Sequence, residues 1–246
     1  APQTLEVTGD GAGLKVNDVL VGEVWFASGQ SNMALPIWNG RGNYRDHYGA
    51  TVAAMANCRD LRVAQATRFQ WSAEPRTDLE VKWRAASPDA LVNDRYFSAV
   101  ALYFARELRL ALDCPVGILQ VAWGGTNIDA WTPRSAYENC DPSLRATADY
   151  KLHFGKEWNG KQHATKVIGT PFQQPTALWN AMVADYTPMA MRGFIWYQGC
   201  HNAGEADLYC AKMHALYDGW AKEFRNPGLK LYFAQLAPWK TSWLEI

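Results

Sequence analysis

The sequence predicts an α/β fold with a mostly parallel sheet, and two features of its pattern carry this prediction. Short apolar runs rich in β-branched and aromatic residues alternate along the chain with segments of helical periodicity. Most of these runs lack a polar face, as expected of strands that are covered by helices on both sides. Strands that alternate with helices form parallel sheets with right-handed crossovers. In such sheets the functional residues gather where strands end, at the carboxyl edge.

The elements are expected in a regular order. Residues 18–27 predict the first buried strand and residues 61–65 a second short strand, with a polar loop over residues 39–47 between them. Apolar residues at three- and four-residue steps predict an amphipathic helix over residues 98–112, and Pro115 follows it. The remaining predicted elements are a strand over 116–123, short helices and a loop within 135–166, a helix over 176–183, a strand over 192–197, a helix over 207–224 and a strand over 229–236.

Composition excludes several classes of function. The chain has 246 residues with 24 Lys and Arg against 24 Asp and Glu, so it lacks the basic excess typical of proteins that bind nucleic acid or anionic membranes. No apolar run approaches the roughly 20 residues that span a bilayer. The five cysteines form no C-x-x-C pair, so no zinc site is predicted, and no glycine-rich fingerprint for NAD or ATP is present. We therefore expect no nucleic acid, membrane, metal or cofactor partner.

Polar, glycine-containing turns follow the ends of three predicted strands. They lie at residues 29–32, 124–127 and 198–202. Because parallel strands end at one edge of their sheet, we expect these turns to converge. This convergence is the strongest functional signal in the sequence.

Ser31 in the first turn has two interpretations. It follows a buried strand and is expected to open a helix, where free N–H groups favour developing negative charge and a serine can act as a nucleophile. Serine is also a favoured helix N-cap, and a capping role is the more frequent one for an isolated serine at such a junction.

The other two turns supply hydrogen-bond donors. Gly124 and Gly125 leave backbone N–H groups unobstructed, and Gln198 and Asn202 offer carboxamides, so with the Ser31 N–H they could form an oxyanion hole. Each feature by itself is more often structural: a Gly-Gly pair commonly forms a tight turn, and a Gln or Asn side chain commonly hydrogen-bonds to the backbone. The 12 tryptophans are expected to lie mostly in the core, with a few left to stack on sugar rings at the rim of a site.

Three ordered blocks of sequence resemble a known family. They read Gly22-Glu-Val-Trp-Phe-Ala-Ser-Gly-Gln-Ser-Asn-Met33, Val116-Gly-Ile-Leu-Gln-Val-Ala-Trp-Gly-Gly-Thr126 and Phe194-Ile-Trp-Tyr-Gln-Gly-Cys-His-Asn-Ala203. These blocks resemble those of the sialate O-acetylesterases, SGNH-type carbohydrate esterases related to some acetylxylan esterases. The resemblance implies a three-layer α/β/α flavodoxin-like fold, removal of O-acetyl groups from carbohydrate, most readily from sialic acid, and a secreted or periplasmic location.

Carried over by position, the resemblance assigns roles to particular residues. Ser31 would be the nucleophile that forms an acetyl-serine intermediate, and its N–H would stabilise the oxyanion together with that of Gly125. Gln198 matches the carboxamide of the third block, and Asn202 is a helper.

Two departures from the family pattern bear on the base. Cys200 stands where many relatives have glutamate, and the chain contains no Asp-x-x-His motif, which in the family supplies the base. A C-terminal segment outside this sequence, or a second chain, is therefore expected to supply Asp and His. The alternative base is His201, the histidine nearest to the third turn. Residues 1–17 are interpreted as the end of a preceding β-rich domain or an N-terminal extension, and residues 18–246 as the esterase domain without its C-terminal part.

The sequence also fits two other functions and one other nucleophile. The chain could be a carbohydrate-binding module that descends from such an esterase and has no base, or an acetylxylan esterase. A further alternative makes Cys200 the nucleophile and His201 its base, although neighbours on an extended segment point to opposite sides.

Overall fold

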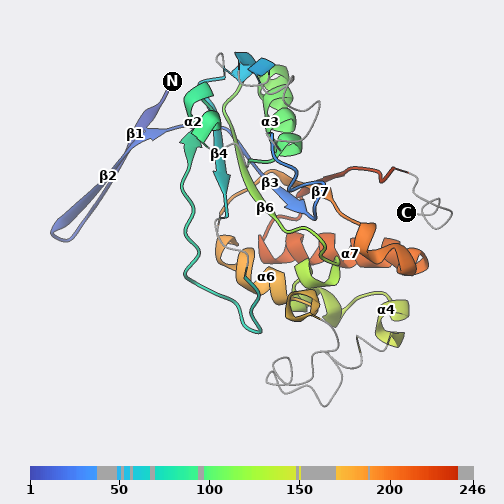
Figure 1. Cartoon of the computed structure of the whole chain (residues 1–246). Coiled ribbons are helices and arrows are strands. Elements are labelled where there is room, and N and C mark those ends of the chain that lie inside the picture. Colours follow the sequence, from blue (N-terminus) through green and yellow to red (C-terminus); the bar gives the residue numbers. More distant parts are fainter. Residues whose placement is uncertain are drawn as a thin grey trace.

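The protein is an α/β structure whose main sheet lies between helices (Figure 1). It is a computed structural model that describes residues 1–37, 49–50, 53–55, 58–66, 70–93, 97–147, 150, 170–187 and 189–237. The predicted loop over 39–47 lies outside these residues. Within the described part of the chain, no helix is long and apolar enough to cross a membrane.

The main sheet has six strands in the order β5-β4-β6-β3-β7-β8. Their bounds are β3 Glu23–Gly29, β4 Leu61–Gln65, β5 Arg84–Ala85, β6 Val116–Ala122, β7 Gly193–Tyr197 and β8 Lys230–Phe233. All neighbouring strands are parallel except the short β5, which runs antiparallel to β4. The prediction of a mostly parallel sheet is confirmed.

The chain lays its strands on both sides of β3. It first adds β4 and β6 on one side and then crosses to add β7 and β8 on the other. The four parallel strands other than β4 lie in the order β6-β3-β7-β8. Numbered along the chain, this is the order 2-1-3-4 of a flavodoxin-like sheet. The side change makes β3 the topological switch point, where neighbouring connections leave in opposite directions and open a crevice at the carboxyl ends of the strands.

One face of the sheet packs against α3 (Ala99–Leu112). Ser98 caps this helix, since its Oγ accepts a hydrogen bond from Ala101 N at 3.0 Å, and Asp113 ends it in a left-handed conformation. The core on this side contains small residues such as Ala27 of β3 and Ala105 of α3, which allow helix and sheet to approach closely. The short α2 (Pro88–Asn93) precedes α3 in the chain.

The opposite face packs against α6 (Ala177–Met182) and α7 (Ala206–Glu223) and is rich in aromatic rings. Phe194 of β7 stacks on Trp220 of α7 with ring centroids 4.5 Å apart. Trp131 and Trp196 are fully buried here and meet edge to face. Most of the described tryptophans thus belong to the core, as expected, and they supply much of the apolar area that holds α7 on the sheet.

Short helical turns join these elements. They are the 3-10 turns η2 (Asp129–Trp131), η3 (Arg134–Glu138), η5 (Pro171–Gln173), η6 (Ala184–Tyr186) and η7 (Cys200–Glu205), together with α4 (Pro142–Ala146). α4 and all but the first residue of η3 fall within the segment for which short helices were predicted, and residues 148–149 and 151–166 of that segment lie outside the described residues.

The N-terminal residues form an antiparallel hairpin that projects from the sheet (Figure 1). It pairs β1 (Gln3–Gly9) with β2 (Ala12–Val19). The single strand predicted over 18–27 is therefore wrong in its first part, because residues up to Val19 belong to β2 and β3 starts at Glu23. The apolar run misled the prediction because only Gly22 and Glu23 separate the apolar residues 19–21 from those of β3.

Candidate active site

The three polar turns predicted to converge do lie at one edge of the sheet. β3, β6 and β7 are adjacent and parallel, and each turn follows the carboxyl end of one of them. Two backbone hydrogen bonds tie the turns together, from Gln30 N to Tyr197 O at 3.0 Å and from Trp123 N to Gly29 O at 3.1 Å. Gly29 is required here because its φ is +138° and a Cβ would lie 2.3 Å from Tyr197 O.

Ser31 is exposed in the first turn after β3. Ala34 N donates to Gln30 O at 2.9 Å, which closes a single turn, and the chain then extends to a bridge between Pro36 and Ser98. The expected helix after Ser31 is therefore wrong: Ser31 heads one turn only, because the pairing of Pro36 with Ser98 draws the chain into an extended path. Ser31 is accordingly no helix N-cap.

The glycine turn after β6 lies directly against Ser31. A Cβ placed on Gly124 would lie 3.4 Å from the Cβ of Ser31, so the two backbones are in close contact. Gly125 has a φ of +73°, a left-handed conformation that favours glycine. Within the described part of the chain, neither the Ser31 N–H nor the Gly125 N–H donates to an acceptor. The two N–H groups predicted as oxyanion donors thus have no acceptor among the described residues.

A residue that the sequence did not single out holds this glycine turn. The Gln173 carboxamide donates to Gly125 O and accepts from Asn127 N at 2.9 Å, so η5 clamps the turn on both sides. Its neighbour Phe172 stacks on Trp123 with ring centroids 4.8 Å apart. Both rings are only partly buried, and they lie next to the turn that contacts Ser31.

Gln198 is 3% exposed, and its carboxamide is fully engaged. Its Nε2 donates to Thr126 O at 2.9 Å and to Asn202 Oδ1 at 2.7 Å, and its Oε1 accepts from Tyr209 Oη at 2.7 Å. Both amide hydrogens are thus used within the protein. In this structure Gln198 braces the second turn against the third, and no donor is left for a substrate oxygen.

Asn202 is 1% exposed and joins the same brace. Its Oδ1 accepts from Ile128 N at 3.0 Å, and its Nδ2 donates to Glu205 Oε2 at 2.7 Å. The predicted oxyanion donors therefore fall into two groups. The Ser31 and Gly125 N–H groups have no acceptor among the described residues, whereas the Gln198 and Asn202 side chains bind one another.

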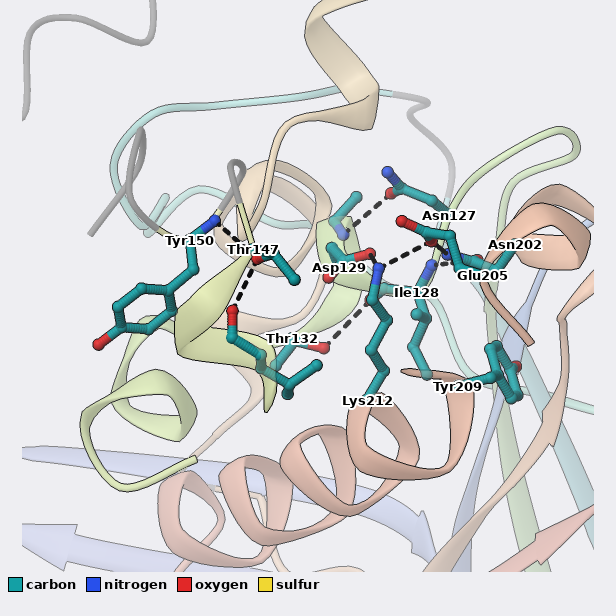
Figure 2. A network of polar contacts seen from close by, with 12 residues as sticks. Asn127, Ile128, Asp129, Thr132, Thr147, Tyr150, Asn202, Glu205, Tyr209 and Lys212 are labelled. Atoms are coloured by element: carbon teal, nitrogen blue, oxygen red, sulfur yellow. Dashed lines mark hydrogen bonds and ion pairs between the residues drawn. The ribbon is translucent and has the colours of Figure 1, made fainter. Parts of the chain in front are cut away.

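A charged cluster behind Asn202 was not predicted (Figure 2). Lys212 of α7 lies between Asp129 and Glu205, with Nζ at 2.8 Å from a carboxylate oxygen of each. Burial alone would raise the pKa of Glu205, but the Lys212 ammonium and the Asn202 amide lower it below its ordinary value. The sequence signal was available, because Lys212 interrupts the apolar stripe of α7 that runs through Tyr209 and Leu216.

No interaction among the described residues links the histidine and cysteine candidates to Ser31. His201 N donates to Gln30 Oε1 at 3.2 Å, but among the described residues no hydrogen bond joins the His201 or His214 imidazole to Ser31. Partial burial raises the pKa of the Cys200 thiol, which is opposite to the activation that a cysteine nucleophile needs. The described residues contain no group of three or more His, Cys, Asp or Glu that could hold a metal ion.

A sequence model for the carbohydrate esterases called sialic acid-specific acetylesterases matches residues 21–246, which include all three turns. The chain belongs to this family. It is 33% identical to the sialate O-acetylesterase of Rattus norvegicus over 245 residues, and 30% identical to that of Homo sapiens over 216 residues. These alignments cover 92% and 87% of this chain, respectively.

A solved structure also resembles this esterase-family chain. A carbohydrate acetylesterase from Xanthomonas citri superposes with a TM-score of 0.73 at 33% identity, over 96% of this chain and 46% of the other. The chain spans 43% of the rat relative's length and 38% of the human relative's. The chain thus corresponds to less than half of each of these relatives.

Proposed function

We propose that this chain carries the nucleophile and oxyanion donors of a serine esterase that removes O-acetyl groups from carbohydrates. One observation carries the proposal: exposed Ser31 lies against the Gly124–Gly125 turn at the switch point of the sheet, beside two N–H groups without a partner in the described part of the chain. A nucleophile and oxyanion donors at a single edge are the parts that acyl transfer requires.

The proposed reaction has two steps. Ser31 Oγ attacks the acetyl carbonyl carbon and gives its proton to a base, while the Ser31 and Gly125 N–H groups bind the resulting oxyanion. The tetrahedral intermediate expels the sugar oxygen, which takes up a proton, and leaves an acetyl-serine. Water then attacks this ester, acetate leaves, and Ser31 regains its proton.

We propose that the base lies outside the described residues. Its expected source is a segment carrying Asp and His that the longer relatives would have, and the lack of a bond from His201 or His214 to Ser31 supports this. His201 stays the candidate within the described residues, because catalytic hydrogen bonds can tighten only when substrate binds.

The substrate class follows from the family and from the aromatic pair beside the site. Trp123 and Phe172 form a partly exposed stack at the glycine turn, and such faces pack against the C–H faces of sugar rings. O-acetylated sialic acid is the leading substrate, since the relatives are named for it. Acetylated xylan is the alternative substrate, and sugar binding without turnover is the alternative function.

The test compares Ser31→Ala with the unchanged protein. We expect Ser31→Ala to abolish acetate release from O-acetylated sialic acid or an aryl acetate, measured in a polypeptide of the full length of its relatives. This chain alone is expected to be nearly inactive, because its base is proposed to lie elsewhere. His201→Ala tests the alternative base: an unchanged rate supports a base outside the described residues, and a lost rate would assign the base to His201. Glycan affinity retained with no acetate release from either unchanged protein would instead favour the binding module.

A further inference from the structure

The buried lysine of α7 lies at the start of a chain of hydrogen bonds that leads to the oxyanion turn. Lys212 is 6% exposed, and its ammonium is held by Asp129 on η2 and Glu205 at the end of η7. A buried ion pair seldom stabilises a fold more than well-packed apolar residues would. Fixing one arrangement of polar groups is the best-attested use of such a pair.

Glu205 passes this constraint to Asn202. The same oxygen, Glu205 Oε2, accepts from Lys212 Nζ at 2.8 Å and from Asn202 Nδ2 at 2.7 Å (Figure 2). Because a carboxylate only accepts hydrogen bonds, it forces the NH₂ end of Asn202 toward itself. Oδ1 of Asn202 must then face the opposite way.

The direction of Asn202 determines the direction of Gln198. With Oδ1 turned inward, Asn202 accepts from Ile128 N at 3.0 Å and from Gln198 Nε2 at 2.7 Å. Gln198 Nε2 then also donates to Thr126 O at 2.9 Å, the residue after Gly125. A flipped Asn202 would place its NH₂ against both of these donors, and the brace on the glycine turn would be lost.

We infer that Lys212, acting through Glu205 and Asn202, is a positioning residue that orients the Gln198 carboxamide and so holds the Gly125 turn against Ser31. This inference rests on the proposed function for its consequence in catalysis. The orientation itself is a property of the folded chain and can be measured without any substrate.

Asp129 provides a matched control for Glu205. Both carboxylates bind Lys212 at 2.8 Å, but only Glu205 contacts Asn202. Asp129 is also the more buried, with 15% of its side chain exposed against 39% for Glu205. A role in stability alone predicts that Asp129→Asn is at least as harmful as Glu205→Gln, whereas a positioning role predicts the reverse order for orientation and rate.

The first readout is the amide NMR spectrum of ¹⁵N-labelled protein. We expect Glu205→Gln to shift or split the side-chain NH₂ signals of Asn202 and Gln198 and the backbone signal of Gly125, and Asp129→Asn to leave them in place. In protein that releases acetate, Glu205→Gln should lower kcat about 10–100-fold with KM unchanged, the loss typical of a misplaced group. Asp129→Asn should change kcat less than about threefold, well below that loss.

Exchanging the acid and the amide gives a second variant. In the double variant Asn202→Asp with Glu205→Gln, the carboxylate at 202 accepts from Ile128, Gln198 and the new glutamine, and the net charge is unchanged. Partial recovery of the Gln198 signals relative to Glu205→Gln is expected, as for coupled neighbours.

Unchanged NH₂ signals in Glu205→Gln would overturn the inference, as would equal effects of the two single variants on signals and rate. If the signals shift as expected but the unchanged protein of full length releases no acetate, the orientation of Gln198 stands and the proposed function is removed. The two proposals therefore fail separately.

Discussion

The first and third turns at the edge of the sheet are built in opposite ways. Ser31 is exposed, and its side chain makes no hydrogen bond within the described residues, whereas Gln198 and Asn202 are buried and brace the turns with their side chains. An attacking hydroxyl must reach substrate, so its environment has to stay open. A brace is effective only when each of its polar groups has a partner, because a half-satisfied buried network destabilises a protein.

The largest loss of stability is expected from removing the Asn202 side chain, which braces the third turn. Asn202→Ala leaves Ile128 N without its acceptor. It also removes one partner from Gln198 Nε2, which keeps Thr126 O, and one from Glu205, which keeps Lys212. We expect the free energy of unfolding, measured in urea, to fall by about 3 kcal/mol, the cost of leaving buried polar groups unsatisfied. Ser31→Ala should change it by less than about 0.5 kcal/mol, as for other surface substitutions. Similar losses in both variants would remove the contrast between the two turns.

A loss of stability of intermediate size is expected at the glycine turn. Substituting Gly125 tests backbone strain, and substituting its neighbour Gly124 tests steric crowding. Gly125→Ala puts a side chain at φ +73° with no atom within 4 Å, so strain should cost about 1 kcal/mol of stability and displace the N–H. Gly124→Ala places a methyl group 3.4 Å from the Cβ of Ser31 without a left-handed backbone. Urea unfolding should therefore show the larger loss for Gly125→Ala, and acetate release should fall in both. A stability loss confined to Gly124→Ala would contradict this account of Gly125.

The smallest effect concerns pH. The pKa of Glu205 is lowered in the folded protein, against an ordinary value of 4.5, by Lys212 and Asn202. Its ionised form therefore adds stability that is present above pH 4.5 and is lost as pH falls through the lowered pKa. In Glu205→Gln the fall in unfolding free energy toward acid pH should be less steep than in the unchanged protein, as followed by thermal unfolding. Ser31→Ala is the control and should follow the unchanged protein, and equal slopes in all three would show that Glu205 does not contribute.

Local pattern determined most of the elements. The helix predicted over 98–112 is found as α3, and the strands predicted at 61–65 and 192–197 are found as β4 and β7 with little change. Periodicity was sufficient because each segment buries a face that its own residues define. It was insufficient at residues 18–27, where the run of apolar residues crosses from the hairpin into β3.

The sequence by itself determined the α/β class, the three polar turns and the family, because strand ends, glycines and motif blocks are local features. Only the tertiary structure decided which donors are available. Gln30 Oε1 meets Gly199 N across 169 positions of sequence, and Gln198 meets Thr126 across 72. A carboxamide looks the same in sequence whether its hydrogens face a substrate or a neighbouring turn, and the packing of distant segments determines which of these holds.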